Sequence, residues 1–255
     1  MERGSPGRHE VEIVRRSDAN RAIAAAAAAF AEARIHLPPL AFWRPRDWHE
    51  HRSDALEVMK AGLGWDVVEW RPGRFAEHGL VLFTLRNVAR TDRSNGGDGY
   101  AEKIMRVQSR QRTPLHAHYR KMEDIVNRGG GDLVMELQAG RHDRGECQFL
   151  LNGVSKRIGR GGEAVVLSPG ESITLRPGVY HAFYASGGAV IAGEISTRND
   201  DVVDNDFREP TERFPRFEED VPAERLVVAD YRRLMSEWEA RSSDPLAGGG
   251  PPEGP

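Results

Sequence analysis

The feature that most constrains the fold is a succession of short strand-like segments between residues 65 and 196. They are rich in valine, isoleucine, leucine, phenylalanine and threonine, and glycine, proline, asparagine or aspartate stands in nearly every gap. This pattern favours a β-sandwich or barrel. No strand–helix alternation appears and no GxGxxG follows a strand, so a dinucleotide-binding fold is disfavoured. The expected strands are 66–70, 80–86, 101–108, 113–119, 132–138, 146–151, 163–167, 172–175, 181–184 and 189–196.

Helices are expected on both sides of these strands. Alanine has the best helix propensity, so the alanine-rich run 22–31 predicts a helix that ends near Arg34. Either Ser17 or Asp18 would cap its first turn. Further helices are expected over 51–60 and 223–241.

The chain therefore divides into five expected parts. The last of them is rich in glycine and proline, a composition that is typical of disorder. The parts are a flexible N-terminus at 1–16, a helical segment packed on the barrel at 17–64, a β-barrel at 65–222, a C-terminal helix at 223–241 and a disordered tail at 242–255.

Composition disfavours several classes of function. The 255 residues carry a formal net charge of −3, which gives no basic surface for nucleic acid. A single cysteine, Cys147, rules out an intrachain disulfide and any multi-cysteine metal site, and it suits a reducing cytoplasm. The run 22–31 is too short to span a bilayer and is flanked by charges. We therefore expect a cytoplasmic protein without a nucleic-acid or membrane partner.

Four side chains have the types and spacing of a metal site. His116 and His118 are two residues apart, so on a strand both point to the same face. Glu123 follows closely, and His181 lies just past a Pro-Gly turn. Three imidazoles and one carboxylate can hold a divalent transition metal and leave positions free for substrate. An HxH pair alone also arises by chance on surface strands, but the addition of Glu123 and His181 favours metal binding.

The pattern H-x-H-x4-E, then a glycine run at 129–131 that predicts a turn, then P-G-x-x-H, resembles the paired motifs of the cupin superfamily. Two positions depart from it. Arg110 stands where the first motif usually has glycine, and Ala185 stands where the second usually ends in asparagine. The resemblance implies a mainly β protein, a cupin-type jelly-roll β-barrel with N-terminal helices and a C-terminal helix. It also implies a metal site inside the barrel.

Longer stretches resemble the D-lyxose isomerase family of cupins, and the similarity runs from about residue 20 to 235. The resemblance implies an enzyme that interconverts D-lyxose with D-xylulose, often D-mannose with D-fructose as well, through a metal-chelated enediol. It also implies one divalent ion per chain, with Mn²⁺ preferred, and a homodimer. The similar stretches are Leu37–Trp43, Leu63–Asp66, Leu82–Asn87, Ala101–Met105, His118–Gly131 and Gly193–Asp201.

Aldose–ketose isomerisation needs a group that carries a proton between C2 and C1 and a group that stabilises two enediolate oxygens. A divalent ion can chelate both oxygens. The four ligands by themselves suit Mn²⁺, Fe²⁺, Co²⁺, Ni²⁺ or Zn²⁺.

Glu194 is the expected proton carrier. It lies in the apolar stretch 189–195 beside Gly193, where burial would raise the pKa of its carboxyl and suit a base near neutrality. The alternative is a structural carboxylate paired with Arg128 or Arg176.

Three further residues are candidates for contact with the sugar. Lys121, two residues before Glu123, would neutralise an enediolate oxygen, or else be a solvated lysine at a strand end. Asn199 and Asp200 would bind hydroxyl groups of the substrate, or else only form a turn.

Two other functions use the same ligands. An iron-dependent cupin dioxygenase would show oxygen uptake and a largely apolar pocket, and the polar stretch 194–201 argues against it. A non-catalytic cupin would bind a sugar without proton exchange.

Overall fold

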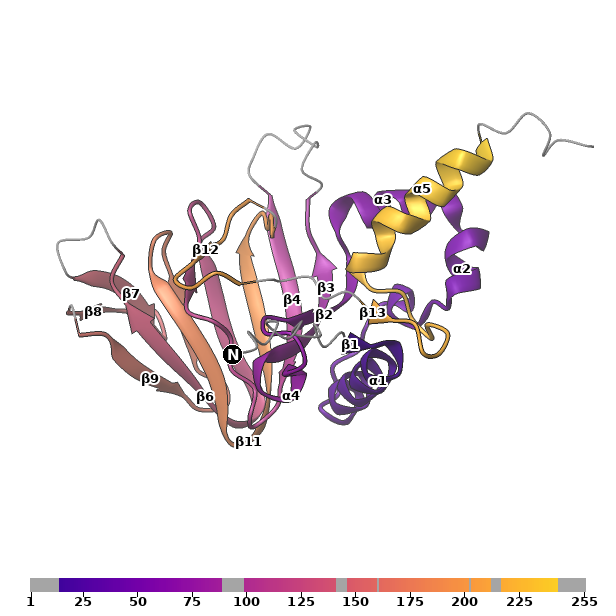
Figure 1. The fold of residues 1–255 in the computed structure, drawn as a ribbon. Helices are drawn as coiled ribbons and strands as arrows, with labels where there is room; N and C mark the ends of the chain where they lie inside the picture. Colours follow the sequence, from indigo (N-terminus) through magenta and orange to yellow (C-terminus); the bar gives the residue numbers. More distant parts are fainter. Residues whose placement is uncertain are drawn as a thin grey trace, which may run out of the picture.

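The computed structural model describes residues 14–88, 99–140, 146–159, 161–201, 203–211 and 217–242 (Figure 1). Antiparallel strands dominate, and helices lie near both ends of the sequence, which confirms the mainly β class. Most of the expected flexible N-terminus and disordered tail lies outside the described residues. No described helix is long and apolar enough to cross a membrane.

The strands are β1 Val14–Arg15, β2 Gly64–Glu69, β3 Gly79–Arg86, β4 Tyr100–Val107, β5 His116–Ala117, β6 Glu123–Gln138, β7 Cys147–Leu151, β8 Val154–Ile158, β9 Glu163–Leu167, β10 Ser172–Leu175, β11 Tyr180–Thr197, β12 Asp206–Phe207 and β13 Phe217–Glu218. The helices are α1 Arg16–Glu32, α2 Pro45–Glu50, α3 Arg52–Ala61, α4 Phe75–His78 and α5 Tyr231–Ser242, with 3₁₀ turns at Pro39–Phe42 and Val228–Asp230. Because α1 begins at Arg16, the expected caps Ser17 and Asp18 lie inside its first turn.

The two longest strands, β6 and β11, organise the sheet. They pair with each other along most of their length, and the C-terminal half of β11 also pairs with β4. The hydrogen-bonded order is β2-β3-β4-β11-β6-β10-β7-β8, with β9 beside the C-terminal half of β6, and β5 and β12 beyond β11. The two long strands therefore connect β2, β3 and β4 on one side to β7, β8, β9 and β10 on the other, in the manner of a jelly roll. Its path ends at β2 and β8, so the expected barrel is open among the described strands.

Both long strands bend at one place, where glycine is required. Gly130 has φ +99°, and a Cβ added there would overlap the carbonyl oxygen of Ala189. The register between β6 and β11 shifts at this point. The turn expected at 129–131 is therefore wrong, because the glycine run lies inside β6. For the same reason the expected strands 181–184 and 189–196 form one bent strand.

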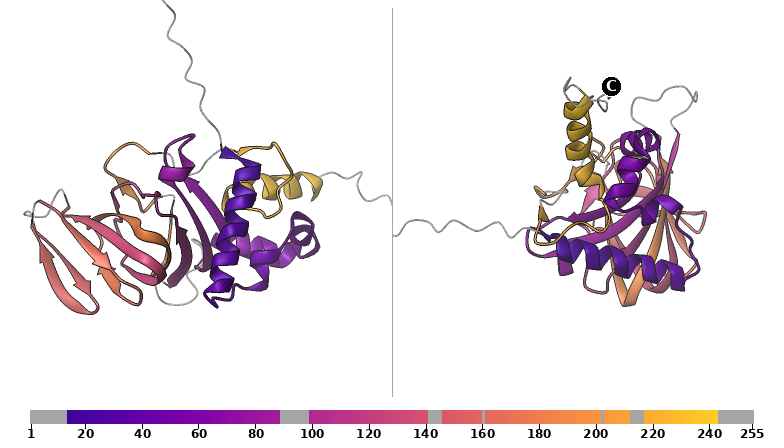
Figure 2. Two further views of the ribbon diagram at one scale, coloured as in Figure 1. Left: turned by 90° about the horizontal axis from the view of Figure 1, so that it is seen from below. Right: turned by 90° about the vertical axis from the view of Figure 1, so that its right-hand side faces the viewer.

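Strands β2, β3 and β4 bury side chains on both faces. Their inner face contributes Leu82 and Met105 to a core shared with β6, β9, β10 and β11. Their outer face contributes Val67 and Phe83 to a second core, which α1 covers with Phe30 (Figure 2). The inner core surrounds the functional side chains, and the outer core holds the strands that carry them.

A third cluster joins α2, α3 and α5 around Trp48 and Tyr231. The C-terminal helix expected from residue 223 begins only at Tyr231. The carboxylate of Asp230 accepts a hydrogen bond from the backbone N–H of Val227 at 3.0 Å, which caps the 3₁₀ turn that precedes the helix.

Candidate active site

Three histidines meet inside the jelly roll. His116 lies on β5, and His118 is the first residue after this strand. Strand β5 is much shorter than the expected strand 113–119. His181 lies at the start of β11 and is the register partner of His116. The candidate ligand atoms of the three rings lie within 4.8 Å of one another, so together they could hold a metal ion.

Backbone carbonyls fix the orientation of all three rings. The Nδ1 atoms of His116, His118 and His181 lie 2.9, 2.9 and 3.2 Å from the carbonyl oxygens of Pro114, Asp204 and Val179. A carbonyl oxygen can only accept a hydrogen bond, so each Nδ1 carries the ring proton. The Nε2 atoms then carry lone pairs, which is the form in which histidine binds a metal.

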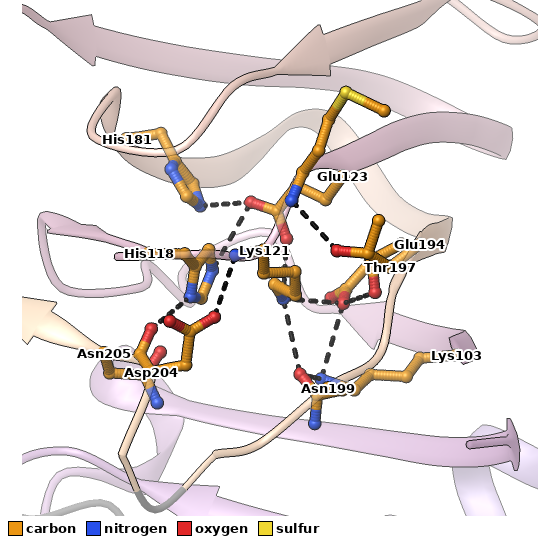
Figure 3. Close-up of polar contacts among 12 residues, drawn as sticks. Lys103, His118, Lys121, Glu123, His181, Glu194, Thr197, Asn199, Asp204 and Asn205 are labelled. Atoms are coloured by element: carbon orange, nitrogen blue, oxygen red, sulfur yellow. Dashed lines mark hydrogen bonds and ion pairs between the residues drawn. The ribbon is translucent and has the colours of Figure 1, made fainter. Parts of the chain in front are cut away.

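Glu123, the first residue of β6, completes this group. Its Oε1 atom lies 2.9 Å from Nε2 of His181 and 3.5 Å from Nε2 of His118 (Figure 3). These are lone pairs that face one another, and among the described residues neither Oε1 of Glu123 nor Nε2 of His118 has a hydrogen-bond partner. Both side chains are buried, where such an arrangement is costly. A divalent cation between these atoms would satisfy all of them.

The electrostatics favour the metal-binding form of these groups. Burial holds the pKa of His116 well below its ordinary value of 6.5, so the ring is neutral. Burial alone would raise the pKa of Glu123, but the ammonium group of Lys121 outweighs burial and holds this pKa well below 4.5. A neutral imidazole and an ionised carboxylate are the forms that ligate.

A second group lies beside the first and is fully paired. The Nζ atom of Lys121 is 2.7 Å from Oε2 of Glu123 and 2.8 Å from Oε1 of Glu194. Nζ of Lys103 is 3.4 Å from the same oxygen of Glu194. Asn199 accepts hydrogen bonds from both lysines, at 3.0 Å from Lys103 and 3.4 Å from Lys121 (Figure 3). The alternative of a carboxylate paired with Arg128 or Arg176 is wrong in its partners, because Lys103 and Lys121 occupy that place.

Glu194 is ionised, contrary to the expected raised pKa. Burial alone would raise the pKa of this carboxyl, but Lys103 and Lys121 outweigh burial and lower it. For Lys121, burial alone would lower the pKa, but Glu123 and Glu194 outweigh it and raise the pKa. The alternative of a solvated lysine is wrong, since Lys121 is only 3% exposed. The buried pair is therefore a carboxylate beside an ammonium group.

A model of the D-lyxose isomerase family matches residues 14–231, a span that contains both groups of residues. The chain belongs to the D-lyxose isomerase family. It is 41% identical over 218 residues to the D-lyxose/D-mannose isomerase of Escherichia coli O157:H7, covering 80% of this chain and 92% of the relative. The similarly named protein of Serratia proteamaculans is 42% identical over 218 residues, covering 81% and 93%. The D-lyxose ketol-isomerase of Cohnella laeviribosi is 28% identical over 200 residues, covering 69% and 99%.

Both groups line one small cavity in this family member. Its volume is about 40 Å³, and its apolar wall includes Trp70, Leu82 and Phe183. A larger groove of about 970 Å³ lies on the outer side, along α1, and contains none of the site residues. The histidines and lysines, rather than the larger groove, mark the chemistry.

The structure separates the two residues expected to bind hydroxyl groups. Asn199 contacts both lysines of the site. Asn199 and Asp200 both line a neighbouring cavity of about 280 Å³, whereas Asp201 lies 3.6 Å from Lys103 and lines both that cavity and the one at the histidines.

Sequence reasoning missed two residues of this site. Lys103 is the register partner of Glu194 across β4 and β11. Its signal was a lysine at an inward position in the alternating pattern of 101–107. Asp204 contacts His118 through its carbonyl oxygen. No local pattern marks Asp204, because the contact depends on the return of the chain over β5.

Proposed function

We propose that this protein is a metal-dependent aldose–ketose isomerase that interconverts D-lyxose with D-xylulose and D-mannose with D-fructose. The observation that carries the proposal is the meeting of a three-histidine, one-glutamate group with a buried, ionised Glu194 held by two lysines. The names of the relatives in Escherichia coli O157:H7 and Serratia proteamaculans support the choice of sugars.

His116, His118, His181 and Glu123 are proposed as the ligands of one divalent ion per chain. The lone pairs that face one another at Glu123 and His118 support this assignment. When bound, the ion would supply Lewis-acid polarisation and orientation of two neighbouring oxygens of the sugar. Nitrogen and oxygen donors without thiolate are compatible with Mn²⁺, the family's expected metal, and also with Fe²⁺, Co²⁺, Ni²⁺ and Zn²⁺.

Glu194 is proposed to move the carbon-bound proton. Its ionised carboxylate would take the proton from C2 of the aldose and return it to C1, while the hydroxyl proton of O2 passes to O1, and the two transfers together give the ketose. The lowered pKa keeps this group deprotonated at neutral pH. It also makes Glu194 a weak base while both lysines contact it. A sugar oxygen that draws one lysine away would raise the basicity of Glu194 at the moment of transfer.

Lys121 is proposed to stabilise the oxygen that becomes negative during this transfer. Its ammonium group stays protonated, and it already bridges Glu123 and Glu194, one residue from each group. A protonated lysine at this place would donate a hydrogen bond to a developing oxyanion. Asn199 would hold the lysines or a sugar hydroxyl, and we retain Asp200 as a candidate for a more distant hydroxyl.

One experiment separates this proposal from its two alternatives. The Mn²⁺-loaded protein is incubated with D-lyxose in D₂O, and the product is analysed for D-xylulose with deuterium at C1. Deuterated product supports proton transfer through an enediol. Oxygen uptake with Fe²⁺ would indicate a dioxygenase, and sugar binding without exchange would indicate a binding protein. If neither lyxose nor mannose gives product, the proposal is wrong.

A homodimer and a cytoplasmic location complete the proposal. The family resemblance supports the dimer, and the single buried free thiol, Cys147, is compatible with a reducing compartment. Sedimentation of the purified protein tests the dimer, and fractionation of the source cells tests the location.

A further inference from the structure

The segment that follows β11 returns across the metal cavity. We call residues 198–207 the strap; residue 202 is not among the described residues. Asn199 lies over the lysines, and β12 pairs with β5, where Phe207 is the register partner of His116. Between these two ends lies Asp204, which is only 6% exposed (Figure 3).

Asp204 makes four polar contacts among the described residues: one joins its backbone N–H to the carbonyl oxygen of Asp200, and the other three go to the segment 118–121. Its carbonyl oxygen accepts the Nδ1–H of His118 at 2.9 Å. Its carboxylate accepts two successive backbone N–H groups, those of Arg120 at 2.9 Å and Lys121 at 3.0 Å. The side chain of Asp204 therefore holds the turn between β5 and β6, and its backbone carbonyl holds the ring of His118, which directly precedes that turn.

This turn joins three of the groups assigned above. His118 precedes it, Lys121 is in it, and Glu123 ends it. A shift of the turn would move two candidate ligands and the lysine at once. Contacts one step removed from a metal commonly set the tautomer and orientation of its ligands, and their loss lowers metal affinity.

We propose that Asp204 is a positioning residue that holds His118 in its ligating tautomer and Lys121 against Glu123. The inference rests on the metal site of the proposed function. In this role Asp204 acts through the turn between β5 and β6 and needs no contact with the substrate.

Binding of Mn²⁺ to the full-length, metal-free protein tests this role directly, by calorimetry. Asp204→Ala is expected to lower the affinity about 10- to 100-fold. Asp204→Asn keeps one acceptor oxygen for the two N–H groups, so a smaller loss is expected. The matched control is Asp206→Asn, also in the strap, whose carboxylate accepts a hydrogen bond from Tyr180 and contacts no candidate ligand. Its affinity should stay within about twofold of wild type.

A second measurement distinguishes positioning from a general loss of stability. Thermal unfolding of the metal-free variants, together with circular dichroism, reports whether each is folded. A merely structural role would lower the unfolding temperature and leave the affinity of the folded protein unchanged, which would overturn the proposal. An equal loss of affinity in Asp206→Asn would overturn it as well. If wild-type protein binds no divalent ion, the metal site itself is wrong, and the positioning role with it.

Discussion

The two ends of the cavity lined by the histidines and the lysines differ in how their charges and lone pairs are paired. At the histidine end, acceptor atoms face one another: Oε1 of Glu123 lies 2.9 Å from a ring nitrogen that carries no proton. At the lysine end, opposite charges alternate, since Glu194 lies between Lys103 and Lys121. With the ring protons on Nδ1, the histidine end presents converging acceptors to a cation, whereas at the lysine end the carboxylate is already paired with two lysines.

The difference assigns each end a separate task. A group of converging acceptors selects and holds a positive ion, and its members have little else to bind. A carboxylate paired with two lysines can exchange one of them for a substrate oxygen and still keep a partner of opposite charge. In the proposed mechanism the histidine end would hold the ion and the lysine end would serve proton transfer. Changes at each end should have separable effects.

The largest effect is expected from His118→Ala. Loss of one imidazole from a buried four-ligand group should abolish retention of the metal, with turnover falling to background, more than about 10³-fold. Metal content after dialysis and the initial rate with D-lyxose measure this. His36→Ala, an exposed histidine on no strand of the site, is the control. Stoichiometric metal in His118→Ala would contradict the assignment of the histidine end.

Glu194→Gln should impair proton transfer at the lysine end and leave metal binding at the histidine end unchanged. The amide keeps the shape of the carboxylate but cannot accept a proton, so kcat should fall about 10²- to 10⁴-fold. The metal content should stay at the wild-type value, because Glu194 contacts lysines and no ligand. Glu102→Gln, whose carboxylate pairs with Arg86, is the control. An active Glu194→Gln enzyme would mean that another group moves the proton.

Lys103→Met should raise the pKa of Glu194 at the lysine end. With only Lys121 left to lower the pKa of Glu194, the opposing effect of burial is less fully offset, and this pKa rises. Turnover needs ionised Glu194 and is lost as the pH falls through its pKa. The acid side of the profile of kcat should therefore move to higher pH.

At neutral pH the Lys103→Met enzyme should lose on the order of tenfold in kcat, as expected for one charge-assisted hydrogen bond. The profile is measured at saturating metal, with Arg106→Met, on the same strand, as the control for charge. An unchanged acid limb would show that Lys103 does not set the pKa of Glu194.

The smallest effect on turnover is expected outside the cavity. Phe30 is fully buried and stacks on Trp65 across the outer face of β2. Phe30→Ala should lower the free energy of unfolding by about 3–5 kcal/mol. The kcat of the folded protein should stay at the wild-type value, since the inner face keeps its side chains. Urea unfolding measures the free energy of unfolding, and the initial rate measures kcat. A large loss of kcat would show that the outer core affects the geometry of the site.

Much of the site could be read from the sequence because its signals are local. His116, His118 and Glu123 lie within eight residues. The partners of Glu194 could not be read in this way. The lowered pKa of Glu194 depends on the register that sets Lys103 opposite it on β4. The expected turn at 129–131 failed for a related reason. A glycine run permits a turn or a bend, and only the pairing of β6 with β11 selects the bend.

The sequence by itself determined the mainly β class, the candidate metal ligands and the likeness to the D-lyxose isomerase family. These follow from the spacing and type of residues, which are properties of the linear sequence and do not depend on the fold. The tertiary structure alone decided that Glu194 is an ionised partner of two lysines and that Asp204 supports His118. Burial and distant charge act in opposite directions on a carboxyl group. Their balance is set by distances between strands, which no stretch of sequence contains.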